Sequence, residues 1–308
     1  MNRILITGAE GFVGSHLVKV LKETLAMIIP TCYPPLRPKT GKYVEMDILN
    51  FEMVRETLKI HNPDIIFHLA AISSVAKSFI DRPATYNTNI MGTVNLLESA
   101  LALNKKIKFI FVSTCEVYGG GENLKEDSPI MLKNPYAVSK YAGELICREY
   151  SGNNIEVMIL RPFNHTGPGQ TPDFVLPSIA RQIAEIERGK KIPLIEVGNI
   201  EVKREFMNVL DVVGAYKLAI EKFVPNEIFN ISSGRSYALG TVIELFKKFA
   251  RVDFEVKVDP TRIRKTDIMV LEGNGEKFAK LTGWSPKIPL EKTVEDLLNY
   301  WRAKIKTS

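Results

Sequence analysis

Tyr136 and Lys140 are spaced for proton transfer, because they follow the dipeptide Asn134-Pro135 and lie four residues apart. After a loop that ends in proline, this spacing places both side chains on one face of a new helix. A nearby ammonium favours the phenolate, so we predict that Lys140 lowers the pKa of Tyr136 below its usual value of about 10. Such a phenol would be a general acid/base for an alcohol oxygen. The same spacing also occurs on exposed helices without any chemistry, so the surrounding sequence has to decide.

A glycine-rich turn near the N-terminus is typical of a dinucleotide site. The apolar run Arg3–Thr7 indicates a buried parallel strand, and a helical pattern over residues 15–23 follows the turn. Gly8 would allow the tight turn, Gly11 a close approach to a pyrophosphate, and Gly14 close packing of the helix on the strand. The pyrophosphate would lie at the helix N-terminus, where free N–H groups favour an anion.

The second strand, at residues 26–31, leaves the choice between NAD(H) and NADP(H) open. An acidic residue normally ends this strand in NAD-binding folds and binds the adenosine ribose. Here the strand is followed by Cys32-Tyr33-Pro34-Pro35, which contains no acid. Arg37, Lys39 and Lys42 could meet a 2′-phosphate, or they could form a solvated loop.

Strands alternate with helices through the first half of the chain. We predict strands at 42–46, 64–71 and 108–113, and helices at 51–61 and 83–104. This alternation predicts an α/β fold with a doubly wound parallel sheet, whose ligands bind at the carboxyl ends of the strands. The residues at or beyond such ends are Gly8, Ala70, Thr114 and Tyr136. Their convergence supports a chemical role for Tyr136 and Lys140.

Composition excludes several classes of function. The 308-residue chain has a net charge of +6, 45% hydrophobic and 25% charged residues, and its basic residues are interleaved with acidic ones. We therefore expect no nucleic-acid partner. The three cysteines form no CxxC pair and the four histidines lack ligand spacing, so we expect no metal site and a reducing compartment. The chain has no apolar run of membrane-spanning length and no room for a signal peptide, so we expect a cytoplasmic protein without a membrane partner.

The ordered motifs resemble those of the extended short-chain dehydrogenase/reductase (NAD-dependent epimerase/dehydratase) family. The matching residues, between residue 3 and about residue 302, include Thr7-Gly8-x-x-Gly11-x-x-Gly14, Asp47-Ile48, His68-Leu69-Ala70-Ala71, Asn89, Ser113-Thr114 and Tyr136-x-x-x-Lys140. The resemblance implies that Thr114 hydrogen-bonds the substrate O4, that Tyr136 is the general acid/base, and that Lys140 lowers its pKa and holds the nicotinamide ribose. It also implies NADP(H) or NAD(H) contacts at Gly8, Gly11, Phe12, Val13, Gly14, Asp47 (to the adenine), Ile48, Leu69, Ala70, Ala71 and Asn89.

The second half resembles the GDP-4-dehydro-6-deoxy-D-mannose reductases and their relatives, the GDP-mannose 4,6-dehydratases. The resemblance rests on the block from Arg161 to Gln170, on Arg204-Glu205-Phe206 and on the tail from Asp259 to Asp267. It implies a GDP-sugar substrate, with contacts at Ser73, Ser74, Asn164, Val175, Arg204, Arg264 and Asp267. A guanidinium suits a diphosphate because it can bind two oxygens at once. Glu205 replaces the usual aspartate, and we expect this acid to orient the loop.

Glu116 and the loop after Asn164 bear on the choice between reductase and dehydratase. A reductase needs a hydride on the C4 ketone and a proton from Tyr136 on O4, whereas a dehydratase needs a further acid/base. Glu116 stands where the dehydratases carry such a glutamate, so we include it among the catalytic candidates. The loop at residues 166–170 has the reductase form, Thr-Gly-Pro-Gly-Gln. We favour a reductase that makes GDP-rhamnose; the alternatives are a 4,6-dehydratase, a nucleotide-sugar 4-epimerase and a catalytically silent NADP-binding scaffold.

Two domains are expected from this pattern. Residues 1–163 with 206–231 would form the Rossmann domain, and residues 164–205 with 232–308 a smaller α/β domain for the nucleotide sugar, with the substrate in the cleft between them. The resemblance also implies a homodimer formed by the helices at 84–104 and 136–150. Ala137, Ala142 and Ile146 would then face the partner.

Overall fold

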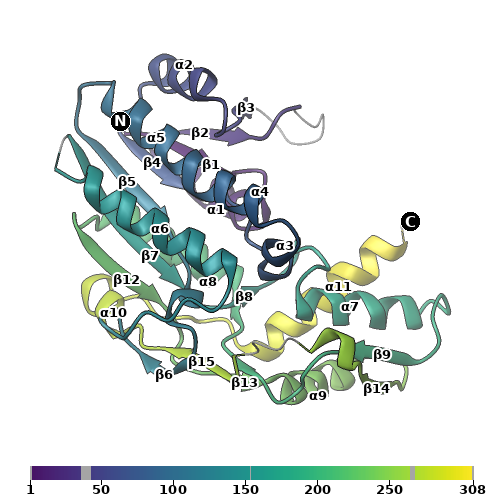
Figure 1. The fold of residues 1–308 in the computed structure, drawn as a ribbon. Coiled ribbons are helices and arrows are strands. Elements are labelled where there is room, and N and C mark those ends of the chain that lie inside the picture. The colour runs from purple at the N-terminus through teal and green to yellow at the C-terminus, as the bar shows by residue number, and fades with distance from the viewer. Residues whose placement is uncertain (1, 36–42, 153, 264–267, 307–308) are drawn as a thin grey trace.

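The computed structural model describes residues 2–35, 43–152, 154–263 and 268–306 (Figure 1). Its centre is a seven-stranded sheet in the order β12-β7-β5-β4-β1-β2-β3, in which every neighbouring pair is parallel. The predicted doubly wound sheet is confirmed. Its strands are β1 (Arg3–Thr7), β2 (Met27–Cys32), β3 (Val44–Glu45), β4 (Ile65–His68), β5 (Ile107–Val112), β7 (Ile155–Pro162) and β12 (Glu227–Ile231).

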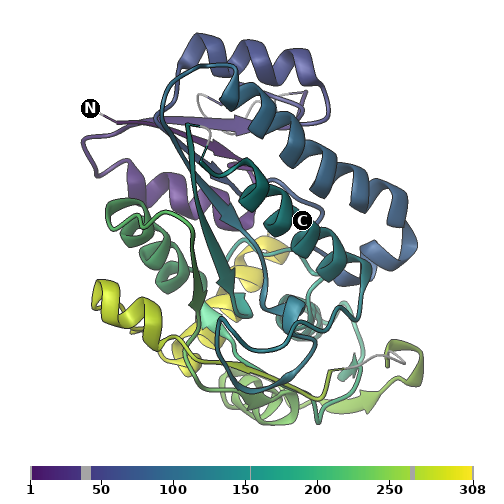
Figure 2. The same cartoon turned by 60° about the vertical axis from the view of Figure 1, so that its left-hand side comes forward.

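Helices cover both faces of this sheet (Figure 2). On one face α1 (Phe12–Leu21) packs against α8 (Val209–Glu221), and on the other α5 (Gly92–Leu101) packs against α2 (Phe51–His61) and α6 (Pro135–Tyr150). Both faces of the strands are apolar, because each faces a helix layer. Of the residues expected to face a partner, Ala137 on α6 is fully buried and Ala142 and Ile146 are half-buried, whereas the exposed large apolar side chain of this helix is Leu145.

The helix expected over residues 83–104 is interrupted. The chain forms α3 (Val75–Ile80), α4 (Arg82–Tyr86), a π turn (Asn87–Met91) and then α5. A π turn inserts an extra residue into the helical repeat and re-aims the side chains within it. Hydrophobic periodicity cannot reveal such an insertion, because the apolar spacing on either side remains helical.

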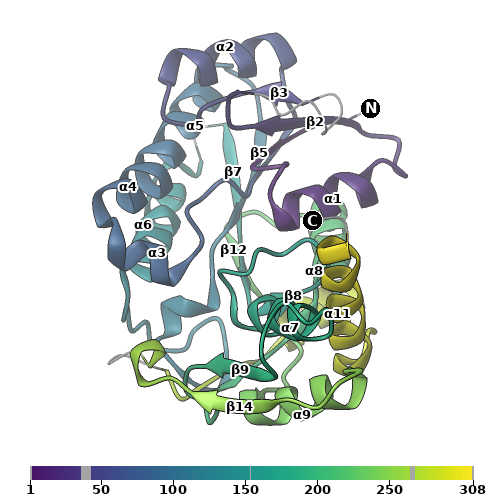
Figure 3. The ribbon, with the colours of Figure 1, turned by 90° about the vertical axis from the view of Figure 1, so that its right-hand side faces the viewer.

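A smaller layer lies below the sheet in Figure 3. It contains α7 (Val175–Ile186), α9 (Leu239–Phe249) and α11 (Leu290–Lys306), together with the paired strands β9 (Leu194–Val197) and β14 (Glu255–Val258). These elements share a second apolar core, which includes Ile183, Val242 and Leu297. The sequence therefore builds a second body over the carboxyl ends of the parallel strands.

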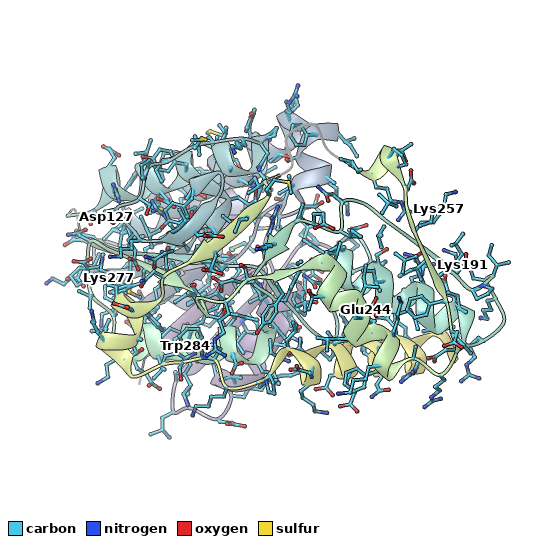
Figure 4. All side chains as sticks on the ribbon, turned by 90° about the horizontal axis from the view of Figure 1, so that it is seen from below. Asp127, Lys191, Glu244, Lys257, Lys277 and Trp284 are labelled. Carbon is cyan, nitrogen blue, oxygen red and sulfur yellow. The ribbon has the colours of Figure 1, made fainter. Side chains whose placement is uncertain are left out.

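The chain crosses between the two layers more than once. β6 (Gly121–Leu124) pairs with β15 (Val270–Gly273) in a four-stranded sheet that also holds β10 (Lys203–Arg204) and β13 (Tyr237–Ala238), while β8 (His165–Thr166) pairs with β11 (Met207–Asn208). Helix α10 (Glu276–Thr282) returns to β12, where the Phe278 and Phe229 rings lie 5.7 Å apart. Seen from below, Lys277 and Trp284 lie at one end of the molecule, and Lys191 and Lys257 at the other (Figure 4).

Candidate active site

A cavity of about 980 Å³ opens at the carboxyl ends of the parallel strands. Its walls come from both layers, with Gly8, Ala70 and Thr114 on the sheet side and Val175 and Val197 on the side of the smaller layer. This is where open α/β sheets bind their ligands. Most of the residues that the sequence singled out therefore meet in one place.

The glycine-rich turn leaves room for a pyrophosphate. Gly8 has a φ of +64°, and a Cβ there would lie 2.8 Å from the Ala70 backbone nitrogen. A Cβ on Gly14 would lie 2.3 Å from the Gly8 carbonyl oxygen, so only glycine permits this packing. Gly11 caps α1 without a side-chain hydrogen bond, and the first turn of the helix carries no acidic residue. The helix N-terminus is thus open toward the cavity and suits an anion.

The other predicted cofactor residues line the same cavity, with one exception. Lining residues are Phe12, Val13, Asp47, Ile48, Leu69, Ala70 and Ala71. Asn89 does not line it. Its amide group accepts from Ile72 N at 2.8 Å and donates to Ile72 O at 3.1 Å and Ser139 Oγ at 2.8 Å. The π turn directs Asn89 into the protein, where this residue holds the loop after β4 against α6. The contact of Asn89 with the cofactor stays a prediction.

Tyr136 is positioned by the first turn of α6. The Asn134 side chain accepts a hydrogen bond from Ala137 N at 2.7 Å, and Pro135 occupies the first helical position, where its missing N–H is not needed. Ser78 Oγ accepts a hydrogen bond from Tyr136 N at 3.2 Å. The phenol is nearly buried and faces the cavity beside Thr114.

The pKa of Tyr136 departs from the prediction. Burial raises it well above its ordinary value, an effect that hydrogen bonding with the Thr114 side chain only partly offsets. Desolvation disfavours the phenolate and is the largest cause of this shift, and the charge of Glu116 acts in the same direction. In the protein alone Tyr136 is therefore a protonated phenol, which is the form that donates a proton.

Lys140 lies one turn further along α6 and is also buried. Its Nζ is 4.2 Å from the centroid of the Phe111 ring, a cation–π contact. Burial lowers the pKa of Lys140 to about 8, while Cys147 and Glu144 act in the opposite direction. A lysine with this pKa can exchange a proton near neutral pH.

An ion pair behind the site ties three elements together. Arg161 on β7 donates to Glu144 on α6 through Nε at 2.9 Å and Nη2 at 2.6 Å, and both side chains are buried. Ser113 Oγ hydrogen-bonds the same carboxylate. Arg161 Nη1 also donates to Tyr118 Oη at 3.0 Å. Because Ser113 precedes Thr114, and Glu144 follows Lys140 by one turn, this network fixes Thr114 relative to α6.

The substrate side of the cavity holds the remaining predicted residues that the structure describes. Ser73, Ser74, Asn164, Val175 and Arg204 all line it. Asn164 Oδ1 is buried and has no hydrogen-bond partner among the described residues. A buried acceptor without a partner is costly, so it indicates a place where a ligand donor or a water binds. Arg264 and Asp267 lie outside the described residues, as do Arg37, Lys39 and Lys42.

Glu205 holds the segment that carries Arg204. Its buried carboxylate accepts hydrogen bonds from Ser232 Oγ at 2.7 Å, Ser233 N at 2.6 Å and Gly273 N at 2.8 Å. Burial nevertheless raises the pKa of Glu205. This geometry fits the orienting function expected of that acid, because it fastens the end of β10 to the turn after β12.

Glu116 also lines the cavity, and its Oε2 accepts a hydrogen bond from Asn134 Nδ2 at 2.9 Å. The carboxylate is therefore linked to the residue that caps the Tyr136 helix. It lies on the short 3₁₀ turn Cys115–Tyr118 that Thr114 begins.

Several residues that were not predicted as site residues also line the cavity, among them His165, Tyr216, Arg262 and Glu10. Tyr216 lies on α8, where its ring packs 5.2 Å from that of Phe67. Its position in the helix is that of an ordinary core residue, so periodicity could not distinguish it. Arg262 donates to Asp259 Oδ2 at 3.2 Å within its own turn and to Glu196 O at 3.0 Å, and the second contact joins segments far apart in the chain.

The sheet, the glycine turn and the cavity place this chain among the Rossmann-fold enzymes that use NAD(P)(H). The groups at the cavity suit such a cofactor, since the open N-terminus of α1 and the glycine cradle accept a pyrophosphate. The chain belongs to the GDP-mannose 4,6 dehydratase family, whose model matches residues 5–297.

Individual relatives within this class catalyse related reactions. The GDP-6-deoxy-D-mannose reductase of Pseudomonas aeruginosa is 33% identical over 99% of this chain and 98% of its own length. The GDP-6-deoxy-D-talose 4-dehydrogenase of Aggregatibacter actinomycetemcomitans is 31% identical over 91% of each chain. The solved structure of RMD from Pseudomonas aeruginosa complexed with NADPH has a TM-score of 0.88 and 31% identity, covering 99% of this chain and all of its own. Like these proteins, this chain is an NAD(P)-dependent enzyme of the reductase, dehydratase and epimerase group.

Proposed function

We propose that the protein reduces the C4 ketone of GDP-4-dehydro-6-deoxy-D-mannose with NAD(P)H. The observation that carries the proposal is the protonated phenol of Tyr136, buried beside Thr114 at the carboxyl ends of the strands. The full-length similarity to GDP-6-deoxy-D-mannose reductase supports the choice of substrate. The form of the loop at residues 166–170 supports reduction over dehydration.

The residues of the site would supply the proton that the reduction of the ketone requires. When bound, the reduced nicotinamide supplies a hydride to C4 of the sugar. Thr114 would hold O4 by a hydrogen bond, and Tyr136 would donate its phenolic proton to the oxygen as the C=O bond becomes a C–O–H group. Lys140, with a pKa of about 8, would replace that proton or stabilise the transient phenolate. Arg204 and the Asn164 amide would hold the diphosphate of the substrate.

A 4,6-dehydratase is the second candidate, because Glu116 places a carboxylate at the same cavity. The test offers the purified protein either GDP-mannose alone, or GDP-4-dehydro-6-deoxy-D-mannose with NADPH or NADH. We expect the keto sugar to disappear with stoichiometric oxidation of the reduced cofactor. Consumption of GDP-mannose without added reductant would reject the reductase in favour of the dehydratase.

The configuration of the product at C4 needs its own measurement, because 6-deoxymannose and 6-deoxytalose differ only there. We propose the manno product, which is GDP-rhamnose. Proton coupling constants of the isolated sugar distinguish the two. Interconversion of the two isolated 4-hydroxy sugars by the protein, without net oxidation or reduction of the cofactor, would instead indicate a 4-epimerase, and tight dinucleotide binding without any turnover would indicate a scaffold.

The remaining expectations are proposals of the same kind. We propose a cytoplasmic homodimer with a GDP-sugar ligand and no nucleic-acid partner, divided into a Rossmann domain (1–163 and 206–231) and a substrate domain (164–205 and 232–308). Leu145 on α6 is 50% exposed and Met91 on the π turn 46%, and these elements pack together, so they supply an apolar surface for the second copy.

Among the described residues no helix is long and apolar enough to cross a membrane, and no cluster of three or more acidic, His or Cys side chains is placed to hold a metal ion.

A further inference from the structure

A carboxylate stands at the end of β2 although the strand itself carries no acid there. Glu10, in the glycine-rich turn, reaches across so that its Oε1 accepts a hydrogen bond from Tyr33 N at 3.1 Å. Tyr33 is the residue directly after β2, which ends at Cys32. The turn thus supplies from a different segment the charge that a dinucleotide fold usually carries on this strand.

The position of Glu10 in the cavity indicates which part of a bound dinucleotide would lie next to its carboxylate. Glu10 lines the cavity together with Gly11 on one side and Asp47 and Ile48 on the other. A dinucleotide whose pyrophosphate lies at Gly11 and whose adenine lies at Asp47 has its adenosine ribose between them, over the end of β2. The carboxylate of Glu10 lies on that path.

The charge of Glu10 acts on its surroundings at this strand end. After burial, it is the next cause that raises the pKa of both the Cys32 thiol and the Tyr43 phenol, because a negative neighbour disfavours a second negative charge. Only one oxygen of the carboxylate is engaged: among the described residues, Glu10 Oε2 has no hydrogen-bond partner, while Oε1 binds Tyr33 N. A free carboxylate oxygen can accept from a hydroxyl group.

We propose that Glu10 determines cofactor specificity by accepting a hydrogen bond from an adenosine ribose hydroxyl and by repelling a 2′-phosphate. A 2′-phosphate carries a charge of about −1.5 to −2 near neutral pH, so a carboxylate beside it is unfavourable. Glu10 therefore shifts binding toward NAD(H) and away from NADP(H). The proposal rests on the dinucleotide site alone and is independent of which sugar the enzyme reduces.

The test measures dissociation constants of NADH and NADPH for the wild type and for Glu10→Gln, by the change in nicotinamide fluorescence on binding. The glutamine keeps an oxygen that can accept from Tyr33 N, so it removes the charge without removing that contact. We expect the ratio of the NADPH to the NADH dissociation constant to fall on the order of tenfold in the variant. ADP-ribose and its 2′-phosphate, used as competitors, should show the same change because they retain the adenosine ribose and the diphosphate and lack only the nicotinamide.

The control is Glu23→Gln, which removes the same charge from an exposed residue outside the cavity lining. It should leave the ratio unchanged. Raising the salt concentration should narrow the difference between Glu10→Gln and the wild type, since salt screens exposed charges. A ratio that stays within twofold of the wild type in Glu10→Gln, or a variant that weakens both cofactors equally, would overturn the proposal, because a purely structural role for Glu10 predicts equal effects.

Discussion

At the scale of single residues, Tyr136 is the proton donor of the proposed reaction. We predict that Tyr136→Phe lowers kcat by more than about a hundredfold, because the phenylalanine cannot donate a proton to O4. NADPH binding should be nearly unchanged, since the lost hydroxyl faces the reacting oxygen and the variant retains the ring. Single-turnover kinetics with the keto sugar and fluorescence titration with NADPH measure the two effects. Retained activity would remove Tyr136 from the mechanism.

Lys140 gives the protein a specific dependence of stability on pH. Its pKa falls from 10.5 in the unfolded chain to about 8 in the folded protein, because burial disfavours the ammonium. Between these two pH values the unfolded chain binds more protons, so the contribution of Lys140 to the free energy of unfolding rises with pH. The full shift corresponds to about 3 kcal/mol.

The prediction is a difference between two proteins, because buried tyrosines also titrate at high pH. We expect the wild type to gain stability relative to Lys140→Met as the pH rises from about 8 to 10.5. Below pH 8 the difference should be flat. Denaturant unfolding at a series of pH values measures the free energy of unfolding of both proteins. If this free energy depends on pH in the same way in the two proteins, the pKa of Lys140 is not lowered by burial.

At the scale of elements, the sequence predicted the framework of the site better than its electrostatics. The strand, glycine turn and helix from Arg3 to Leu21 follow from local patterns, and the helix at 51–61 has the predicted bounds. The break at Asn87–Met91 does not follow, because a π turn depends on contacts with Ile72 and Ser139 that are remote in the chain. The raised pKa of Tyr136 depends on burial between layers, which a spacing of four residues does not reveal.

The carboxylate at the end of β2 illustrates the same limit. β2 itself carries no acid, because the acid lies in the preceding turn and reaches the end of the strand only in the folded chain. Likewise, Arg262 joins the cavity wall through Glu196, which precedes it by many residues. Motifs locate residues that act through a fixed local geometry, whereas residues that reach a site from a distant segment require the fold.

The pair Glu144–Arg161 is the strongest link between elements of the site. Removing one partner leaves the other charge buried, with a cost of about 3–5 kcal/mol. We therefore predict that Glu144→Gln lowers the midpoint of thermal unfolding and also lowers kcat, since Ser113 and Arg161 lose the negative charge and one of the two acceptor oxygens that they share. Calorimetry and steady-state kinetics measure the two effects.

A surface pair provides the matched control for this prediction. Arg181 and Glu185 form an exposed ion pair at 2.8 Å, one turn apart on α7. Such pairs contribute about 0.3–0.5 kcal/mol, so Glu185→Gln should leave the midpoint almost unchanged. Equal effects of the two substitutions would mean that burial of the Glu144–Arg161 pair has no energetic consequence.

For the whole molecule, the cavity depends on two layers that come from interleaved segments of the chain. β6 follows β5 in the chain but pairs with β15 in the four-stranded sheet, and α10 returns to pack on β12, so neither layer is one continuous segment. Lys77 on α3 and Asp173, just before α7, form an ion pair at 2.7 Å that joins the layers beside the cavity. Because both side chains are exposed, this pair contributes little to stability, and the crossing segments hold the layers together.

The exposed face of α6 is where a second copy of the chain is expected to bind. Leu145 is 50% exposed on a helix whose inner face carries Tyr136 and Lys140. We predict that Leu145→Glu converts the dimer to a monomer, because a charge at the centre of an apolar contact loses its hydration on assembly. Light scattering coupled to size-exclusion chromatography measures the mass of the particle.

A second substitution separates assembly from general surface effects. Ile192 is 69% exposed, near β9 in the smaller layer, so Ile192→Glu adds the same charge far from α6 and should leave the dimer intact. If the α6 surface forms the dimer, Leu145→Glu should also lower kcat, since the helix that positions Tyr136 loses its support from the partner copy. A wild type that elutes as a monomer, or a Leu145→Glu variant that remains dimeric, would place the interface elsewhere or remove it.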